Sequence, residues 1–293
     1  MAIPPRLKPD PIPTIRPTPE HLAEGELKAT YEDVKGALRA PWMGVVAMAF
    51  AHHRGFFDAL WRGFRPIALS APFAEACAEV RAAADAAAAR LSPAPIRAAL
   101  AGEGYAPREL AEIDAVLEVF ARGNPPYALM ATWARLALEG HPLEGPAQAA
   151  AHAGGGGANE ILDRLTLMER HHADPETRAV YDAVMDRLGL PFVNTDYRAL
   201  ARWPSCFARA WGGLSPLVDT PAYAAEVDGI HARLAEAALA LPNPTGMRPE
   251  ALQAAAGADG SLEETLAVVR LFQWLLPGLL TNVAVFQAQL RAA

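Results

Sequence analysis

The sequence is poor in cysteine, and this scarcity narrows the kinds of site that it can build. Only Cys77 and Cys206 occur among 293 residues, and they form no C-x-x-C pair. A disulfide framework is therefore excluded, and a metal site built on paired cysteines is not expected. We predict a protein without a bound metal.

Positive charge is also scarce. Lysine and arginine together number 26 against 33 aspartates and glutamates, which gives a formal net charge of −7. A nucleic-acid binder would show a basic face, so nucleic acid is not an expected partner. An anionic small molecule would have to be held by local donors, because the overall field repels it.

The sequence lacks a long uninterrupted apolar run. Its most apolar stretch, residues 271–286, is interrupted by polar residues, a proline and a glycine, as in a buried helix and unlike a membrane span. The first residues are rich in proline and lack the apolar core of a secretory signal. We therefore expect a soluble, cytoplasmic protein with no membrane partner, and a homodimer is left open.

Strand patterns are missing too, whereas alanine is abundant and β-branched residues are sparse. The composition predicts an all-α fold, with prolines and helix caps marking the ends of the helices. The expected helices are 20–38, 42–52, 54–65, 71–91, 94–101, 107–122, 125–139, 158–187, 195–202, 204–217, 221–240, 248–256, 261–275 and 277–292.

An internal repeat is the strongest sign of organisation. A shift of 150 residues places 21–91 on 171–241 without a gap, and 19 of the 71 positions are then identical. The matches Trp61/Trp211 and Pro66/Pro216 carry more weight than the alanines, which composition alone would supply. With a shift of 151–152, residues 109–139 fall on 261–290.

The repeat predicts two homologous helical units packed as a pseudo-dimer within one chain. The expected parts are a Pro-rich arm (1–19), a first repeat (20–140), a Gly/Ala-rich linker (141–160) and a second repeat (161–293). An interface between two such units can hold a single cleft lined from both sides, a common place for a small-molecule site.

Asp196 is the first candidate for chemistry, because the two copies differ there. Asn194-Thr195-Asp196 lies on Gly44-Val45-Val46, so the first copy begins the same helix without a carboxylate. An aspartate at a helix start is commonly a cap for the free amides. The comparison between the copies supports a role beyond the fold, and both interpretations stay open from the residues alone.

Asn124 is the second candidate and lies in the first copy, in the segment Gly123-Asn124-Pro125. The following proline makes a helix cap the simpler interpretation, with the helix starting at residue 125. Its counterpart in the second copy is a leucine, Leu275 or Leu276. Each half thus carries one polar residue where its sister is apolar, as expected for a single asymmetric site in a pseudo-symmetric cleft.

The segment PFVNTDYRALARWPSCFARAWGGLSPLV, the earlier GNPPYAL and the twofold helical repeat together resemble the group I 2-haloacid dehalogenases, which include the DL-2-haloacid dehalogenases. This resemblance covers nearly the whole chain. It implies an all-α pseudo-dimer that hydrolyses the carbon–halogen bond of short 2-haloalkanoic acids without a metal or organic cofactor.

The resemblance also implies roles for residues. Asp196 looks like the family's catalytic aspartate and Asn124 like the asparagine that helps to hold the water. Thr195, Tyr197 and Trp42 are the predicted substrate-binding residues, and the Thr195–Tyr197 amides are a candidate place for the substrate carboxylate. We expect Asp196 to activate a water that attacks C2 with inversion. Attack by Asp196 itself is the rival mechanism.

Two other functions stay open at this point. The first is a helical protein like alkylhydroperoxidase D, although the C-x-x-C of its peroxidase members is absent here. The second is a non-redox protein that binds small carboxylates in the same cleft without reacting with them. Halide release from 2-chloropropionate separates an enzyme from a binder.

Overall fold

The computed structural model describes residues 3–148, 150–152 and 165–291. Within these residues the regular structure is helical, apart from one isolated antiparallel bridge between Ser70 and Ala151. The all-α prediction is therefore confirmed for the described part of the chain. The elements are η1 (Glu20–Leu22), α1 (Gly25–Leu38), α2 (Val45–Phe50), α3 (Arg54–Ala68), α4 (Ala71–Leu91), α5 (Arg97–Gly102), α6 (Pro107–Leu138), α7 (Pro175–Leu188), α8 (Thr195–Leu200), α9 (Pro204–Val218), α10 (Pro221–Ala240), α11 (Pro249–Ala258) and α12 (Leu262–Arg291).

In the described part of the chain, the helices form two series, α1–α6 and α7–α12, and helices at the same position in the two series have similar lengths. Helices α1 and α7 have 14 residues each, α2 and α8 have 6, and α3 and α9 have 15. The long helices α6 and α12 have 32 and 30 residues. Each series thus has a six-residue helix, α2 or α8, at its second position.

Single hydrogen bonds are also repeated at a distance of 150 residues. The Tyr31 hydroxyl donates to the Thr18 carbonyl at 3.0 Å, and the Tyr181 hydroxyl donates to the Met168 carbonyl at 2.7 Å. The Ser70 hydroxyl caps α4 and the Thr220 hydroxyl caps α10 in the same way. Local sequence therefore sets equivalent turns in both series.

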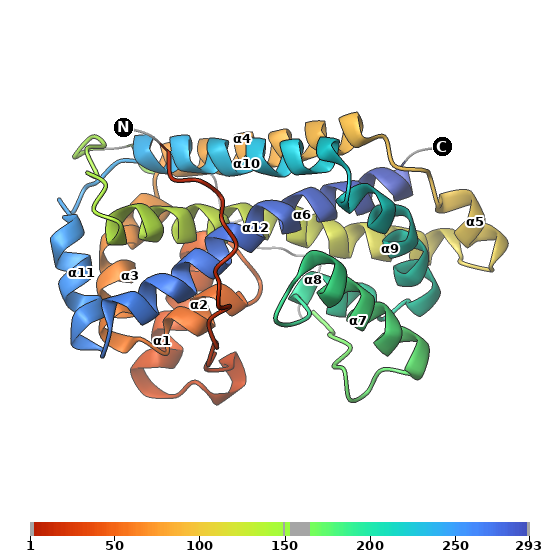
Figure 1. The fold of residues 1–293 in the computed structure, drawn as a ribbon, viewed down its shortest axis with the longest axis horizontal. Helices are drawn as coiled ribbons and strands as arrows, with labels where there is room; N and C mark the ends of the chain where they lie inside the picture. Colours follow the sequence, from red (N-terminus) through yellow and green to blue (C-terminus); the bar gives the residue numbers. More distant parts are fainter. Residues whose placement is uncertain (1–2, 149, 153–164, 292–293) are drawn as a thin grey trace.

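The core lies around two long helices that pack along each other, α6 and α12, and α4 and α10 pack against both of them. Figure 1 shows α4 and α10 along one side of the molecule, with α1–α3 and α11 at one end and α5 and α7–α9 at the other. Nearly every side chain in the middle of α6 and α12 is buried. The two series are therefore joined through one core.

Two long helices pass through prolines at which the sequence predicts a break. Helix α6 contains Pro125 and Pro126, and α12 contains Pro277. The expected boundaries at 122–125 and 275–277 are wrong, although an internal proline removes a backbone hydrogen bond. Both helices are buried against each other, and this packing keeps each helix continuous through its prolines.

The expected helix 158–187 is also wrong for residues 165–174. Residues 158–164 lie outside the described residues, and 165–174 are not α-helical. Helix α7 begins only at Pro175, where the Asp174 carboxylate accepts a hydrogen bond from the Thr177 amide at 2.8 Å. Much of the predicted linker, residues 149 and 153–160, lies outside the described residues, which include 141–148 and 150–152.

The described part of the predicted Pro-rich arm, residues 3–19, is extended and lies across α12 (Figure 1). Near its start, the Pro5 carbonyl accepts from Arg135 and the Pro4 carbonyl contacts the His231 ring at 2.8 Å. The Arg6 guanidinium donates to the Trp274 carbonyl at 3.0 Å. The arm is thereby fixed to both long helices.

Helix α12 is long and apolar enough to cross a membrane by length and composition. In the fold, 94% of its most apolar 18-residue window is buried. The same length and composition are found in the core helices of soluble proteins.

Candidate functional site

A cleft of about 1680 Å³ lies between the two helical series. The arm, the residues before α2 and the residues before α8 contribute to its wall. Many of its lining residues form pairs 150 positions apart. Examples are Pro41 and Pro191, Trp42 and Phe192, Met43 and Val193, Val45 and Thr195, and Met48 and Arg198.

Asp196 is the second residue of α8 and is only 2% exposed. Its Oδ1 accepts a hydrogen bond from Asn124 Nδ2 at 2.7 Å, which joins α8 to α6 across the core. The residue before the helix, Asn194, makes no side-chain capping bond. The hydrogen-bonded side-chain partner of Asp196 is thus a residue 72 positions away, and the capping interpretation finds no support in this contact.

Burial changes the protonation of this carboxyl group. Removal of Asp196 from water disfavours its charged form and raises its pKa from 3.8 to about 6. The Asn124 hydrogen bond, its own backbone amide and the Arg198 charge act in the opposite direction. The result is a group that is ionised at neutral pH and still a stronger base than an ordinary aspartate.

Asn124 lies inside α6 and is 4% exposed. The expectation that it precedes a helix is therefore wrong, and so is the capping interpretation based on Pro125. The adjacent Gly123 lets the Trp42 ring approach, because a Cβ at that position would lie 2.3 Å from Trp42 Cη2. Asn124 is thus held on a buried helix and directly follows the residue that Trp42 packs against.

Only some of the predicted site residues line the cleft. Trp42 and Thr195 line it, while Asp196, Asn124 and Tyr197 are buried and do not line it. Trp42 packs edge-on against Phe120, with 4.9 Å between ring centroids. The Tyr197 hydroxyl faces α12, where Asn282 Nδ2 donates to it at 2.9 Å. The predicted contact of Tyr197 with substrate therefore finds no support in the lining of the cleft.

Arg198 was not among the predicted site residues, although it lines the cleft. Its guanidinium donates to Glu169 at 2.6 Å and to Thr195 Oγ1 at 3.4 Å, and its Nε is buried without a partner. The counterpart at 150 residues' distance is Met48. Comparison of the two copies shows that Arg198 replaces Met48. A charged residue in place of an apolar one is, however, often simply exposed to solvent, so this difference alone does not indicate a binding residue.

Tyr223 and Asn282 were missed in the same way. The Tyr223 hydroxyl donates to Asn282 Oδ1 at 2.8 Å, and both side chains are buried. Their counterparts in the first copy are Phe73 and, within the 151–152 shift, Met130 or Ala131. The sequence signal was therefore present, but burial of these residues is visible only in the fold.

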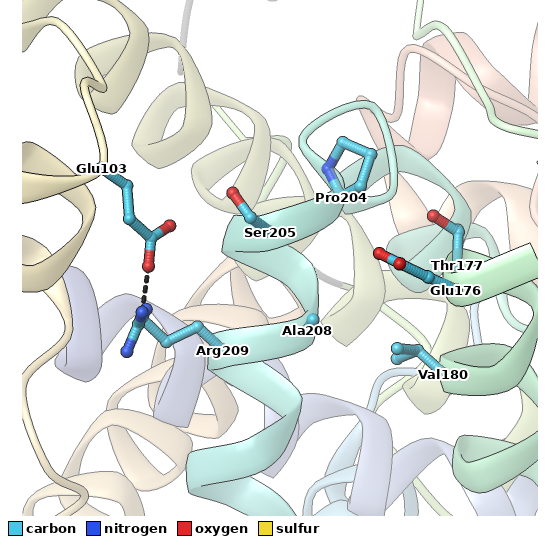
Figure 2. Close-up of a pocket in the computed structure, with 8 residues that line it drawn as sticks. All are labelled: Glu103, Glu176, Thr177, Val180, Pro204, Ser205, Ala208 and Arg209. Atoms are coloured by element: carbon cyan, nitrogen blue, oxygen red, sulfur yellow. Dashed lines mark hydrogen bonds and ion pairs between the residues drawn. The ribbon is translucent and has the colours of Figure 1, made fainter. Parts of the chain in front are cut away.

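A second, smaller hollow of about 430 Å³ lies between α7, α9 and the end of α5. Figure 2 shows Glu103 and Arg209 facing each other across it, joined by an ion pair. None of the predicted site residues lines it. The candidate site is therefore at the larger cleft.

The described residues also bear on metal and thiol chemistry. They contain no group of three or more histidine, cysteine, aspartate or glutamate side chains that could hold a metal ion. Cys77 and Cys206 are both free, and burial raises the pKa of each thiol, that of Cys206 to about 12. Thiols in this state are poor nucleophiles, which disfavours a peroxidase-like function.

No family model matches this chain. It is 46% identical over 245 residues to the (R)-2-haloacid dehalogenase of Rhizobium sp. (strain NHG3), an alignment that covers 83% of this chain and 95% of the relative. It is 39% identical over 293 residues to the (R)-2-haloacid dehalogenase of Pseudomonas putida, with coverage of 94% and 92%.

A solved structure matches over almost the whole length. This is a D-2-haloacid dehalogenase in complex with L-LA, which has a TM-score of 0.86 and 35% identity and covers 99% of this chain and 100% of that chain. Sequence and fold therefore agree across both helical series. The chain belongs to the 2-haloacid dehalogenases, a family of hydrolases that act on carbon–halide bonds.

Proposed function

We propose that this enzyme converts short 2-haloalkanoic acids to 2-hydroxyalkanoic acids by direct attack of water on C2, with Asp196 as the general base. The observation that carries this proposal is the buried pair of Asp196 and Asn124, joined at 2.7 Å between the two helical series. Halide release from 2-chloro- and 2-bromopropionate by the purified protein tests it. An enzyme that binds these acids without releasing halide would contradict it.

Asn124 and Asp196 have complementary roles in the proposed step. The Asn124 amide gives one hydrogen to Asp196 and keeps a second hydrogen and a carbonyl oxygen for a water molecule. Asp196 accepts a proton from that water while the water oxygen bonds to C2 and the carbon–halogen bond breaks. The products are a hydroxy acid, a halide ion and a protonated Asp196, which then loses its proton to solvent. General-base assistance of this kind contributes roughly 10²–10⁴-fold.

Arg198 and Thr195 are the proposed holders of the substrate carboxylate. Both line the cleft beside the buried aspartate, and Arg198 supplies the local positive charge that an anionic substrate needs in a protein of net charge −7. Trp42 and the apolar residues of the wall would receive the halogen and the alkyl group. The attacking water then approaches from the side of Asn124.

Covalent attack by Asp196 is the rival mechanism, in which C2 forms an ester with the carboxylate before water releases it. A single turnover with excess enzyme in ¹⁸O-water separates the two. Direct attack puts the label in the hydroxy acid and none in the protein. Unlabelled product, with ¹⁸O in the peptide that contains Asp196, would contradict direct attack.

The enantiomer consumed is a further part of the proposal. The group I resemblance leaves the enantiomer open, because members of that group differ, whereas the relatives from Rhizobium sp. and Pseudomonas putida are named (R)-2-haloacid dehalogenases. We favour the (R)-enantiomer. Racemic 2-chloropropionate should then yield (S)-lactate and leave (S)-2-chloropropionate. Complete consumption of the racemate to racemic lactate would favour the DL assignment instead.

The pseudo-dimer is proposed as the origin of the cleft. Three observations support two homologous units: the equal order of helix lengths, the hydrogen bonds repeated at 150 residues, and the paired lining residues. Each unit carries one half of the catalytic pair, because Asn124 belongs to the first and Asp196 to the second. A site that is asymmetric in chemistry thus sits in a cleft that is nearly symmetric in shape.

A further inference from the structure

A buried chain of hydrogen bonds runs from α10 through α12 to the helix that carries Asp196. The Tyr223 hydroxyl donates to Asn282 Oδ1 at 2.8 Å, and Asn282 Nδ2 donates to the Tyr197 hydroxyl oxygen at 2.9 Å. All three side chains are at most 6% exposed. Tyr197 directly follows Asp196 in α8.

The fold itself does not require these polar groups. Their counterparts in the first series are Ala47 for Tyr197, Phe73 for Tyr223, and Met130 or Ala131 for Asn282. These residues are buried too, so the same places in the first series are filled by apolar side chains. Burial of polar groups is unfavourable unless they are hydrogen-bonded. The polar chain at three positions of one series therefore indicates a need beyond packing.

Helix α8 is a short element and makes few internal bonds. It has six residues, and its N-cap residue Asn194 makes no side-chain capping bond. Successive side chains on a helix point about 100° apart. The bond from Asn124 to Asp196 and the bond from Asn282 to Tyr197 therefore hold α8 from two directions. Together they restrict its rotation about its own axis.

The Tyr197 ring is also fixed by its neighbours. It lies 6.2 Å from Phe286 on α12, edge-on, and 6.3 Å from Phe207 on α9. Burial keeps both Tyr197 and Tyr223 in the neutral phenol form by raising their pKa values. A neutral chain of this kind orients a group and supplies no charge of its own.

We propose that Tyr223, Asn282 and Tyr197 are positioning residues, which hold α8 so that the Asp196 carboxylate stays aligned with Asn124. This inference rests on the proposed role of Asp196. It assigns a function in the reaction to two helices, α10 and α12, that contribute no proposed substrate contact.

The test uses Asn282→Leu, which keeps the volume and removes both bonds, and the milder Tyr223→Phe, which removes one. The matched control is Thr281→Val, since Thr281 is also buried on α12 but bonds only to the Pro277 carbonyl of its own helix. The first readout is the titration of the Asp196 carboxyl carbon by NMR, assigned with Asp196→Asn. The second readout is kcat and KM for halide release.

The hydrogen bond from Asn124 lowers the pKa of Asp196. Loss of alignment weakens this bond, so the pKa of Asp196 should rise in Asn282→Leu and should rise less in Tyr223→Phe. The charged group that acts on Asp196, Arg198, is unchanged in all variants. In an Asn124→Ala background the same substitutions should add no further rise. We expect kcat to fall about 10- to 100-fold with KM little changed, and Thr281→Val to behave as wild type.

Several results would overturn the inference. One is an Asn282→Leu protein, or a folded Tyr223→Phe protein if the first does not fold, with an unchanged or lowered pKa of Asp196. Another is an equal effect in Thr281→Val. Because the titration needs no turnover, it tests the positioning role even if wild-type protein releases no halide. Absence of halide release from wild type would instead contradict the proposed function.

Discussion

At the scale of single residues, the environment of Asp196 costs stability. Its pKa is about 6 in the folded protein and 3.8 for an ordinary aspartate, so the folded state binds the proton more tightly. Stability is therefore highest below pH 3.8 with respect to this group, falls as pH rises from 3.8 to 6, and stays lower above pH 6. The cost at neutral pH is about 3 kcal/mol.

The first prediction concerns Asp196→Asn. Asparagine has almost the same shape and no charge to bury, so the variant should be inactive and yet more stable than wild type at pH 8, by about 1–3 kcal/mol. Urea unfolding at pH 8 and pH 5 measures this. The gain should shrink at pH 5. A variant less stable than wild type at pH 8 would show that the aspartate serves the fold.

The second prediction concerns the pH dependence of the reaction. A general base must be ionised, so kcat/KM should rise with pH through about 6 and level off above it. His21 and His171 also line the cleft, so they serve as controls. The rise of kcat/KM with pH, the acid limb of the pH profile, should keep its midpoint in His21→Gln and His171→Gln. A limb near pH 4 would contradict a buried base.

The third prediction concerns Arg198→Met, which installs the residue found in the first copy. Loss of a charged hydrogen bond to the substrate carboxylate should raise KM roughly 10- to 100-fold. The limb of the pH profile should also move to higher pH, because the Arg198 charge lowers the pKa of Asp196. Arg170→Met is the control, since Arg170 lines the same cleft and pairs with Asp182 as Arg198 pairs with Glu169, while the charge that acts on the pKa of Asp196 is that of Arg198. An equal rise of KM in both variants would show that the overall positive charge of the cleft, and not a specific contact of Arg198, holds the substrate.

Some of the site could be predicted from the sequence, and some could not. Asp196 and Asn124 stood out because each replaces an apolar residue of the other copy. Tyr223 and Asn282 differ from their counterparts in the same way, but the sequence does not show that they are buried and bonded to each other. A polar residue can be assigned a role in a site only when its burial and its hydrogen-bond partners are known.

At the scale of elements, the segment before α2 depends on close packing against α6. Gly123 is the point of contact, because any Cβ there would overlap the Trp42 ring. The ring in turn walls the cleft beside Asn124. Helix α6, which carries Asn124, therefore packs closely against the loop that carries Trp42 and forms part of the cleft wall.

The fourth prediction concerns Gly123→Ala. The added methyl group must displace Trp42, so we expect a loss of stability of about 1–3 kcal/mol and a marked loss of halide release. Gly229→Ala is the matched control, because Gly229 is exposed in α10 with no atoms within 4 Å of an added Cβ, and alanine there should stabilise the helix. Thermal unfolding and halide release measure both. An active, stable Gly123→Ala protein would contradict this role of the contact.

Helix starts were easier to predict than helix interiors. Ser70 and Thr220 each cap a helix with their own side chain at the predicted starts, and such signals are local. Asp174 caps α7 in the same way, but the helix predicted for 158–187 overran this signal. The prolines at 125 and 277 are local signals of the opposite kind, and they misled. What keeps α6 and α12 continuous is mutual packing between residues about 150 positions apart, which no local pattern contains.

At the scale of the whole molecule, the two helical series share one core. Helix α12 packs on α4 and α6, α10 packs on α4 and α6, and α11 packs on α3. Each series therefore covers apolar surface of the other. The two related units proposed from the repeat are therefore not independent domains, because neither series is packed without the other.

The fifth prediction follows from this shared core. Residues 1–148 and 165–293, expressed separately, should each be insoluble or lack fixed tertiary packing, because their long helices would expose apolar faces. Expressed together, they should associate and recover halide release. Size-exclusion chromatography and near-UV circular dichroism measure this. Cooperative unfolding of either fragment alone would contradict it.

The packing of α12 along α6 also has a consequence for how the chain reaches its fold. Helix α6 leaves the ribosome well before α12, yet the apolar faces of the two helices cover each other. A contact between segments so distant in sequence forms slowly and leaves hydrophobic surface open in the meantime. Synthesis therefore passes through a long interval in which α6 is complete and uncovered, and a molecular chaperone that recognises apolar helices would find its target there.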